Sequence, residues 1–255
     1  MKQVVRSFLV LAFSAFLFSC AQSTGGADYR NETGANGLPT PRALFARYTE
    51  ALGGERVLRS HESKTMSGSF ALTSFGLSGT MEMKVAAPNH FVQNIELGGM
   101  GTINSGFNGD VAWSSDPLSG AQRLSGQALT DMARQGEYFV SLTYESLYPQ
   151  QETIGMSEVN GESAYEVVLT ADDGRATTVY FSEESALISR QIATIASPLG
   201  DVRTVTDMHE YGEFDGEVLP TVMSVDQAGQ QVEVTIDSVS FNDVSDADFT
   251  PPNGI

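Results

Sequence analysis

The sequence has few cysteines and few basic residues. Cys20 is its only cysteine, so the chain cannot form an intramolecular disulfide. Its 14 lysines and arginines are outnumbered by 32 aspartates and glutamates. Loss of the segment before Cys20 would remove two bases and no acids, which leaves a net charge of −20. Because so acidic a chain repels phosphate groups, we expect no nucleic-acid partner.

Recognisable catalytic and metal-binding motifs are also missing. His61, His90 and His209 are far apart in the sequence, and none belongs to a zinc-protease motif or a pair at ligand spacing. The nearest approach to the nucleophile motif of α/β-hydrolases, Gly-Leu-Ser-Gly at 76–79, has the wrong spacing. Pairs of acidic residues lie in predicted turns, where they are solvated. We therefore predict a non-enzymatic protein with no metal ion and no other cofactor.

The most pronounced apolar run lies at the N-terminus, over residues 8–18. Two basic residues precede it, and the small residue Ser19 follows it directly before Cys20, which together form the three parts of an export signal. The run is too short to cross the bilayer's hydrocarbon core of roughly 30 Å, so we do not expect a transmembrane helix.

Residues 17–20 (Leu-Phe-Ser-Cys) resemble the lipobox of bacterial lipoproteins. The resemblance implies cleavage before Cys20, a diacylglyceryl thioether on its thiol and an acyl group on its amine. Stable anchoring needs more than one acyl chain, and this modification provides it. Ala21 follows the cysteine, which by the lipoprotein sorting pattern implies the outer membrane. The alternative is an ordinary secretory signal that contains a cysteine by chance.

The chain divides into three predicted parts. Residues 1–19 form a lipoprotein signal peptide. Residues 20–38 form the lipidated cysteine and a flexible tether, because this segment is small, polar and rich in glycine. Residues 39–255 have the length of one folded domain.

Two helices are expected in this domain. The first covers 41–52, with Pro41 in its first turn and two glycines after its last, and its apolar residues recur at helical spacing. The second covers 128–144, and Gly136 in its middle predicts a break.

The rest of the domain alternates between strand-like runs and turn residues. Asp173-Gly174 and Ala228-Gly229 separate strand-like runs and predict hairpins in which both turn residues have positive φ. Roughly eleven or twelve strands in succession predict a mainly β (α+β) protein built on one antiparallel sheet, which must curl or close, with helices filling its mouth. The predicted strands cover 63–74, 77–86, 90–97, 102–107, 111–115, 151–158, 163–171, 175–182, 187–195, 201–212, 218–227 and 230–241.

The first sheet segment is crowded with methionine, phenylalanine and aliphatic residues. Such side chains adapt to irregular apolar volumes, so they are candidates for lining a ligand cavity; an ordinary core is the alternative. The candidates are Phe70, Leu72, Phe75, Leu77, Met81, Met83, Phe91, Ile95, Leu97 and Trp113.

The order of these features resembles a known family. In sequence they are Ala-Leu-Gly-Gly at 51–54, FNGDVAW at 107–113, Pro-x-x-Gly at 117–120, VNGESAYEVVLT at 159–170, DGRATTVYFS at 173–182, Leu-Ile-x-Arg at 187–190, Pro-Leu-Gly at 198–200, FDGEVLPT at 214–221, and Phe249 with Pro252. The pattern is similar to that of the outer-membrane lipoprotein-sorting-like proteins, which share a fold with the periplasmic lipoprotein carrier and its outer-membrane receptor. The resemblance implies an open, incomplete antiparallel β-barrel, with helices as a lid over an apolar cavity that accepts acyl chains.

The sequence therefore favours a monomeric protein held to the outer membrane by lipid and facing the periplasm. Its expected partner is a hydrophobic ligand or a lipoprotein acyl chain, in lipoprotein sorting or lipid transport. Two alternatives stay open. One is a protein-interaction or sensor module of the cell envelope with a filled core, and the other is a hydrolase without a recognisable motif.

Overall fold

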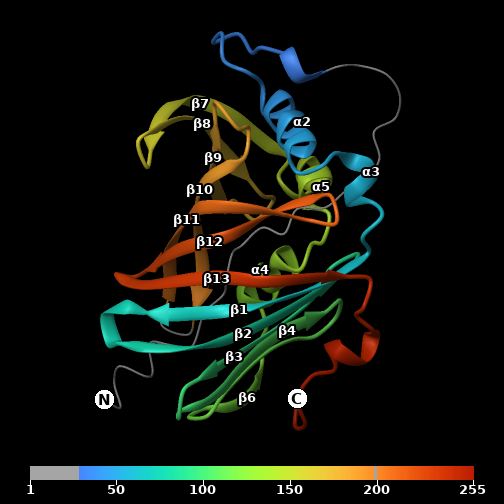
Figure 1. The fold of residues 1–255 in the computed structure, drawn as a ribbon, viewed down its shortest axis with the longest axis vertical. Helices are drawn as coiled ribbons and strands as arrows, with labels where there is room; N and C mark the ends of the chain where they lie inside the picture. The colour runs from blue at the N-terminus through green and yellow to red at the C-terminus, as the bar shows by residue number, and fades with distance from the viewer. Residues whose placement is uncertain (1–28, 198–199) are drawn as a thin grey trace.

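The computed structural model describes residues 29–197 and 200–255. Cys20 and the predicted signal peptide lie outside the described residues. The described chain forms one antiparallel sheet of 13 strands in the order β6-β5-β4-β3-β2-β1-β13-β12-β11-β10-β9-β8-β7 (Figure 1). The strands are β1 Ser63–Leu72, β2 Leu77–Ala86, β3 His90–Leu97, β4 Gly101–Asn108, β5 Ala112–Asp116, β6 Gly120–Arg123, β7 Gln150–Val159, β8 Glu162–Thr170, β9 Ala176–Ser182, β10 Ile188–Ser197, β11 Gly200–Phe214, β12 Glu217–Gln227 and β13 Gln230–Phe241.

This strand order confirms the prediction of a single, mainly antiparallel sheet. Strands β1 and β13, far apart in the sequence, pair at the centre, while β6 and β7 form the two edges. Within the described residues the sheet is open and not strongly curled, so the expected incomplete barrel is confirmed only as far as the single sheet. Right-handed strand twist, distributed over many strands, shapes a sheet of this size without closing it.

In the described part of the chain, four α-helices and three short 3-10 helices accompany the sheet. Helices α2 and α5 contact each other beside β7, while α4 contacts β10 as well as β4 and β5 (Figure 1). Their bounds are α2 Pro41–Ala51, α3 Glu55–Leu58, α4 Gln127–Gln135, α5 Val140–Leu147, η2 Tyr29–Asn31, η3 Thr73–Phe75 and η4 Asp246–Phe249.

Helix α2 begins and ends as its sequence predicts. The Thr40 side chain accepts a hydrogen bond from the Ala43 amide, and Pro41 occupies the first turn. Its buried face includes Phe45 and Tyr48. Phe45 stacks on the Tyr144 ring of α5 at a centroid distance of 3.7 Å, which joins the two helices.

The predicted second helix is divided in two at Gly136. Helix α4 ends there because the chain passes close to the β2–β3 turn. A Cβ on Gly136 would lie 2.7 Å from the carbonyl oxygen of Asn89. The Tyr138 amide donates to the carbonyl of Pro88 at 2.9 Å, which holds the chain out of helical geometry.

Residues 29–38, the end of the predicted tether, make hydrogen bonds to the folded domain. The Asn36 side chain donates to the carbonyl of Thr153 on β7 at 2.9 Å. The guanidinium of Arg47 on α2 donates to the carbonyl of Arg30 at 2.7 Å. These hydrogen bonds join the segment to β7 and α2.

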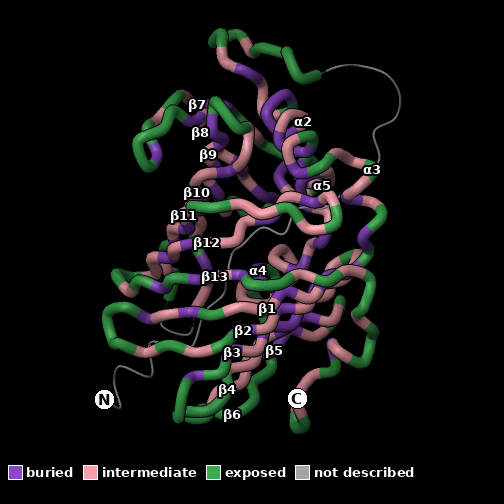
Figure 2. The backbone as a smooth tube through the Cα atoms, in the orientation of Figure 1, coloured by how far each residue is buried: buried purple, intermediate pink, exposed green. Residues whose placement is uncertain are grey.

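The buried residues form one large cluster and one small one. The large cluster joins α2, α4 and α5 to strands on both flanks of the sheet. Figure 2 shows buried positions along α2 and through the middle of the sheet, and exposed positions at the hairpin turns. Along β13, Val232, Val234 and Ile236 are buried, as their alternation predicts. Along β12 the buried residues lie on one face, and the other face is half-buried.

Candidate ligand-binding site

Eight of the ten predicted cavity residues come together on one face of β1, β2 and β3. Seven of them are buried in the large core cluster, and the eighth, Leu77, is half-buried against it. The sheet register explains the grouping, because Ile95 pairs with Met81 and Leu97 pairs with Gly79. The seven are Phe70, Leu72, Met81, Met83, Phe91, Ile95 and Leu97.

Phe75 and Trp113 lie elsewhere. Phe75 is in the turn between β1 and β2 and is 40% exposed. Trp113 is fully buried, but it packs with Val92 and Phe249 in the small cluster. Val92 follows Phe91 directly on β3, so the small cluster lies on the opposite face of the sheet, beneath η4.

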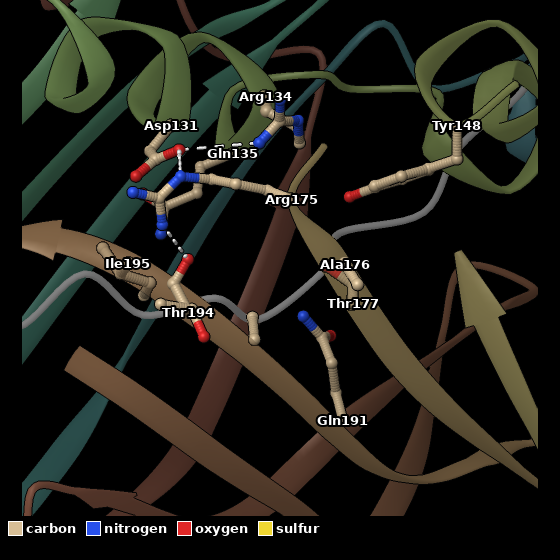
Figure 3. A pocket seen from close by; sticks show the side chains of 11 residues that line it. Asp131, Arg134, Gln135, Tyr148, Arg175, Ala176, Thr177, Gln191, Thr194 and Ile195 are labelled. Atoms are coloured by element: carbon tan, nitrogen blue, oxygen red, sulfur yellow. Dashed lines mark hydrogen bonds and ion pairs between the residues drawn. The ribbon is translucent and has the colours of Figure 1, made fainter. Parts of the chain in front are cut away.

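A pocket opens where α4 approaches β9 and β10 (Figure 3). It has an empty volume of about 490 Å³, part of which is open to solvent. None of the ten predicted cavity residues lines it. The lining residues are Asp131, Arg134, Gln135, Tyr148, Arg175, Ala176, Thr177, Gln191, Ala193, Thr194 and Ile195.

The charged side chains around the pocket are bound to one another. Arg134 lies 2.7 Å from Asp173, and Arg175 lies 2.7 Å from Asp201. Asp131 lies between the two guanidinium groups, at 3.5 Å from Arg134 and 3.9 Å from Arg175. Partial burial acts to raise the pKa of Asp173, but hydrogen bonds from Arg134 and another side chain outweigh it and hold the pKa at about 2. Three carboxylates therefore neutralise two guanidinium groups, and the rim carries a net negative charge.

Three buried, uncharged polar side chains, Gln191, Tyr148 and Thr177, line the pocket beside apolar ones. Gln191 is 1% exposed, and neither its amide nitrogen nor its amide oxygen has a hydrogen-bond partner among the described residues. The buried Tyr148 and Thr177 lie nearby, and both Tyr148 and Gln191 extend into the pocket (Figure 3). Burial raises the pKa of Tyr148 to about 12, so its hydroxyl keeps its proton near neutral pH.

The position of Gln191 on β10 follows from strand alternation. It pairs with the buried Val179 on β9, and two residues further on Ala193 lines the same pocket. Sequence analysis did not identify Gln191. The available signal was that Gln191, a polar residue, shares a strand face with the apolar Ile195.

A second group of ionisable side chains is buried beside α3. The Lys64 ammonium donates a hydrogen bond to Glu217, and both side chains are fully buried. His61 Nδ1 lies 2.9 Å from the other oxygen of Glu217, and His61 Nε2 lies 3.2 Å from Asp215. Burial lowers the pKa of Lys64, against the attraction of Glu217. The group joins β1 to the β11–β12 turn, and no residue of the pocket belongs to it.

His90 and His209 do not belong to this group. His209 lies 2.8 Å from the Ser224 hydroxyl on the exposed surface. In residues 29–197 and 200–255, the structure brings together no three histidine, cysteine, aspartate or glutamate side chains that could hold a metal ion.

The chain resembles known proteins in structure but not in sequence. No protein-family model matches the chain, and no curated protein matches its sequence. A DUF1329 family protein from Desulfovibrio piger has a similar structure, with a TM-score of 0.55 and 13% identity over 82% of this chain and 96% of that chain. A LolA superfamily protein from Nitrosomonas europaea is similar with a TM-score of 0.54 and 16% identity, over 83% of this chain and 97% of that chain. The chain has a LolA-like fold.

The LolA-like fold agrees with the family resemblance seen in the sequence. At these identities the likeness concerns the fold alone, since one fold serves several functions. Among the described residues, none of the helices has both the length and the apolar character needed to cross a bilayer.

Proposed function

We propose that the protein is a lipid-anchored envelope protein that holds a hydrophobic ligand between its sheet and its helices. The ligand class includes the acyl chains of lipoproteins, and the process is lipoprotein sorting or lipid transport. In this proposal the acylated Cys20 anchors a monomeric protein to the outer membrane, facing the periplasm. The LolA-like fold, the lipobox-like residues 17–20 and the family pattern of the sequence support it.

The main structural support for this proposal is that α4 contacts both flanks of the sheet. This helix contacts β10 on one flank of the sheet and β4 and β5 on the other. Seven strand steps separate β4 from β10, which in a flat sheet is about 34 Å at the usual spacing of about 4.8 Å. A helix is only about 10 Å across, so the twist of the open sheet is what brings both flanks to α4. We propose that an acyl chain binds between α4 and the sheet face that it covers.

The chemistry of that space favours an apolar ligand. The sheet face beneath the helices carries the buried methionines and phenylalanines of β1–β3, among them Met81, Met83 and Phe91. Methionine side chains change rotamer at low cost, so they can make room for an alkyl chain. The pocket beside α4 offers a way in, because Tyr148 both lines the pocket and belongs to the large core cluster.

Titration with a fluorescent fatty-acyl probe tests ligand binding. The protein is the mature chain, residues 20–255, with Cys20→Ser to remove the acylation site and nothing else. We expect saturable binding of one probe per chain, which unlabelled long-chain lipid displaces. Absence of saturable binding would reject the proposal in favour of a protein-interaction module with a filled core.

Metabolic labelling with radioactive palmitate tests the anchor separately. We expect the wild-type chain to take up label and to fractionate with membranes, because its lipobox-like residues direct acylation to Cys20. The Cys20→Ser chain should take up none. Equal labelling of the two chains, or a wild-type chain without label, would reject the anchor.

A further inference from the structure

We infer that the pocket between α4 and strands β9 and β10 binds the uncharged, hydrogen-bonding head group of an amphiphilic ligand, such as the glycerol ester of a monoacylglycerol. The inference rests on the proposed function, and it names the part of the ligand that the apolar interior cannot recognise. It selects neutral lipids over free fatty acids and other anionic amphiphiles.

Gln191 supplies the first reason. Its side chain is 1% exposed, and both its amide nitrogen and its amide oxygen lack a partner among the described residues. A buried polar group without a hydrogen bond destabilises the fold, so both atoms favour a ligand that completes their bonding. The carboxamide nitrogen can donate to the ester carbonyl oxygen of a glycerol ester, and the carboxamide oxygen can accept from a glycerol hydroxyl group. Figure 3 shows Gln191 extending into the pocket rather than along its wall.

The charges at the rim supply the second reason. A free cationic side chain would attract a carboxylate or a phosphate, but Arg134 and Arg175 are already bound to carboxylates at 2.7 Å. Asp131 lies within 4 Å of both guanidinium groups and adds a negative charge. An anionic head group would have to displace one of these carboxylates in a protein with a net charge of −18. A neutral head group meets no such opposition.

The remaining lining supplies the third reason. Thr177 and Tyr148 are polar, uncharged and buried, and the pKa of Tyr148 is raised to about 12, so its hydroxyl keeps its proton near neutral pH. Ala193 and Ile195 line the same pocket with apolar surface, and Tyr148 belongs to the large core cluster. A head group placed at Gln191 therefore has neutral polar contacts, while an attached alkyl chain continues onto apolar surface.

The test compares two ligands with the same alkyl chain on the mature protein carrying Cys20→Ser. Monooleoylglycerol and oleate each compete with the fluorescent acyl probe at neutral pH. We expect monooleoylglycerol to bind at least about tenfold more tightly, which corresponds to one or two additional neutral hydrogen bonds and the absence of repulsion.

Two leucine variants assign the preference to the pocket. In Gln191→Leu we expect the affinity for monooleoylglycerol to fall about tenfold while the affinity for oleate stays the same. Gln93→Leu is the matched control, because Gln93 is also 1% exposed with both amide atoms unpartnered, but it lies outside the pocket, opposite Met83 on the apolar sheet face, so its loss should change the affinity for both ligands by the same factor. Each change removes an unpartnered buried amide, so thermal unfolding should show both variants folded and at least as stable as the parent.

Equal affinity for the two ligands would overturn the inference, and so would equal losses in the two leucine variants. Either result leaves the proposed function standing, because the alkyl chain would still bind. Failure of all probes to bind the parent protein would instead reject the proposed function, and the inference with it.

Discussion

Separating Lys64 from Glu217 should destabilise the protein more than removing both. Neither side chain is exposed, and the Lys64 ammonium donates directly to the Glu217 carboxylate. Lys64→Met removes the cation and leaves a carboxylate in the interior with His61, 2.9 Å away, as its remaining close partner. Breaking a buried pair in this way costs about 3–5 kcal/mol, a large part of the roughly 5–15 kcal/mol that stabilises a typical domain.

Replacing both partners changes the balance. In the double variant Lys64→Met/Glu217→Leu no charge of the pair stays buried, and two apolar side chains fill similar volumes. Such replacements are neutral or stabilising by up to about 4 kcal/mol, because the desolvation of two charges no longer opposes folding. We therefore expect the double variant to be at least as stable as the wild type, while each single variant loses several kcal/mol.

Urea unfolding at neutral pH, followed by far-ultraviolet circular dichroism, measures these differences. The comparison needs the wild type, Lys64→Met, Glu217→Leu and the double variant under one buffer condition. Strong coupling between the two sites is the expected result. If the losses of the single variants simply add in the double variant, the reasoning about the buried pair is wrong.

Three further changes test the packing around the sheet. Gly53 has φ +113°, and a Cβ there would lie 2.1 Å from a carbonyl oxygen of the β11–β12 turn. Gly53→Ala should therefore lower the free energy of unfolding in urea by at least about 3 kcal/mol. The control Gly37→Ala, where a Cβ meets no atom within 4 Å, should lower it by about 1 kcal/mol. Phe249→Ala should cost about 3–4 kcal/mol, since it opens a cavity in the small cluster, and a loss below about 1 kcal/mol would refute that packing. A hydrogen bond from Lys84 holds the pKa of Asp248 at about 2, below its ordinary 3.8. At pH values above 3.8, Asp248→Asn should therefore lower the free energy of unfolding by about 1 kcal/mol. This loss should disappear as the pH falls through about 2, and a loss independent of pH would contradict the assignment.

Local sequence signals predicted most of the sheet because each strand carries its own pattern. The alternation of Val232, Val234 and Ile236 is visible without knowledge of their neighbours, and so are the turn residues at Ala228-Gly229, both of which have positive φ. Strand β6 was missed because Gly120–Arg123 is exposed throughout and has no apolar phase. At the Asp173-Gly174 turn only the glycine has positive φ, so one of the two expected conformations was wrong.

The candidate site was less accessible to sequence analysis. Its pocket depends on α4 meeting β10, residues that are distant in the sequence and have no common motif. Strand phase places the polar Gln191 among inward-facing residues, but the absence of a partner for its amide is visible only in the folded structure. The apolar residues of β1–β3 were found together because composition alone marks them. Trp113 was grouped with them by composition, although strand phase puts it on the opposite face.

Native mass spectrometry after bacterial production tests the central claim most directly. The sample is the mature chain, residues 20–255 with Cys20→Ser, followed by organic extraction and analysis of any released lipid. The account predicts a copurified lipid at near-stoichiometric level, with neutral glycerolipids enriched over free fatty acids. A clean protein mass that does not change after incubation with monooleoylglycerol or an acylated peptide would contradict ligand binding and leave the sheet as a scaffold for protein contacts.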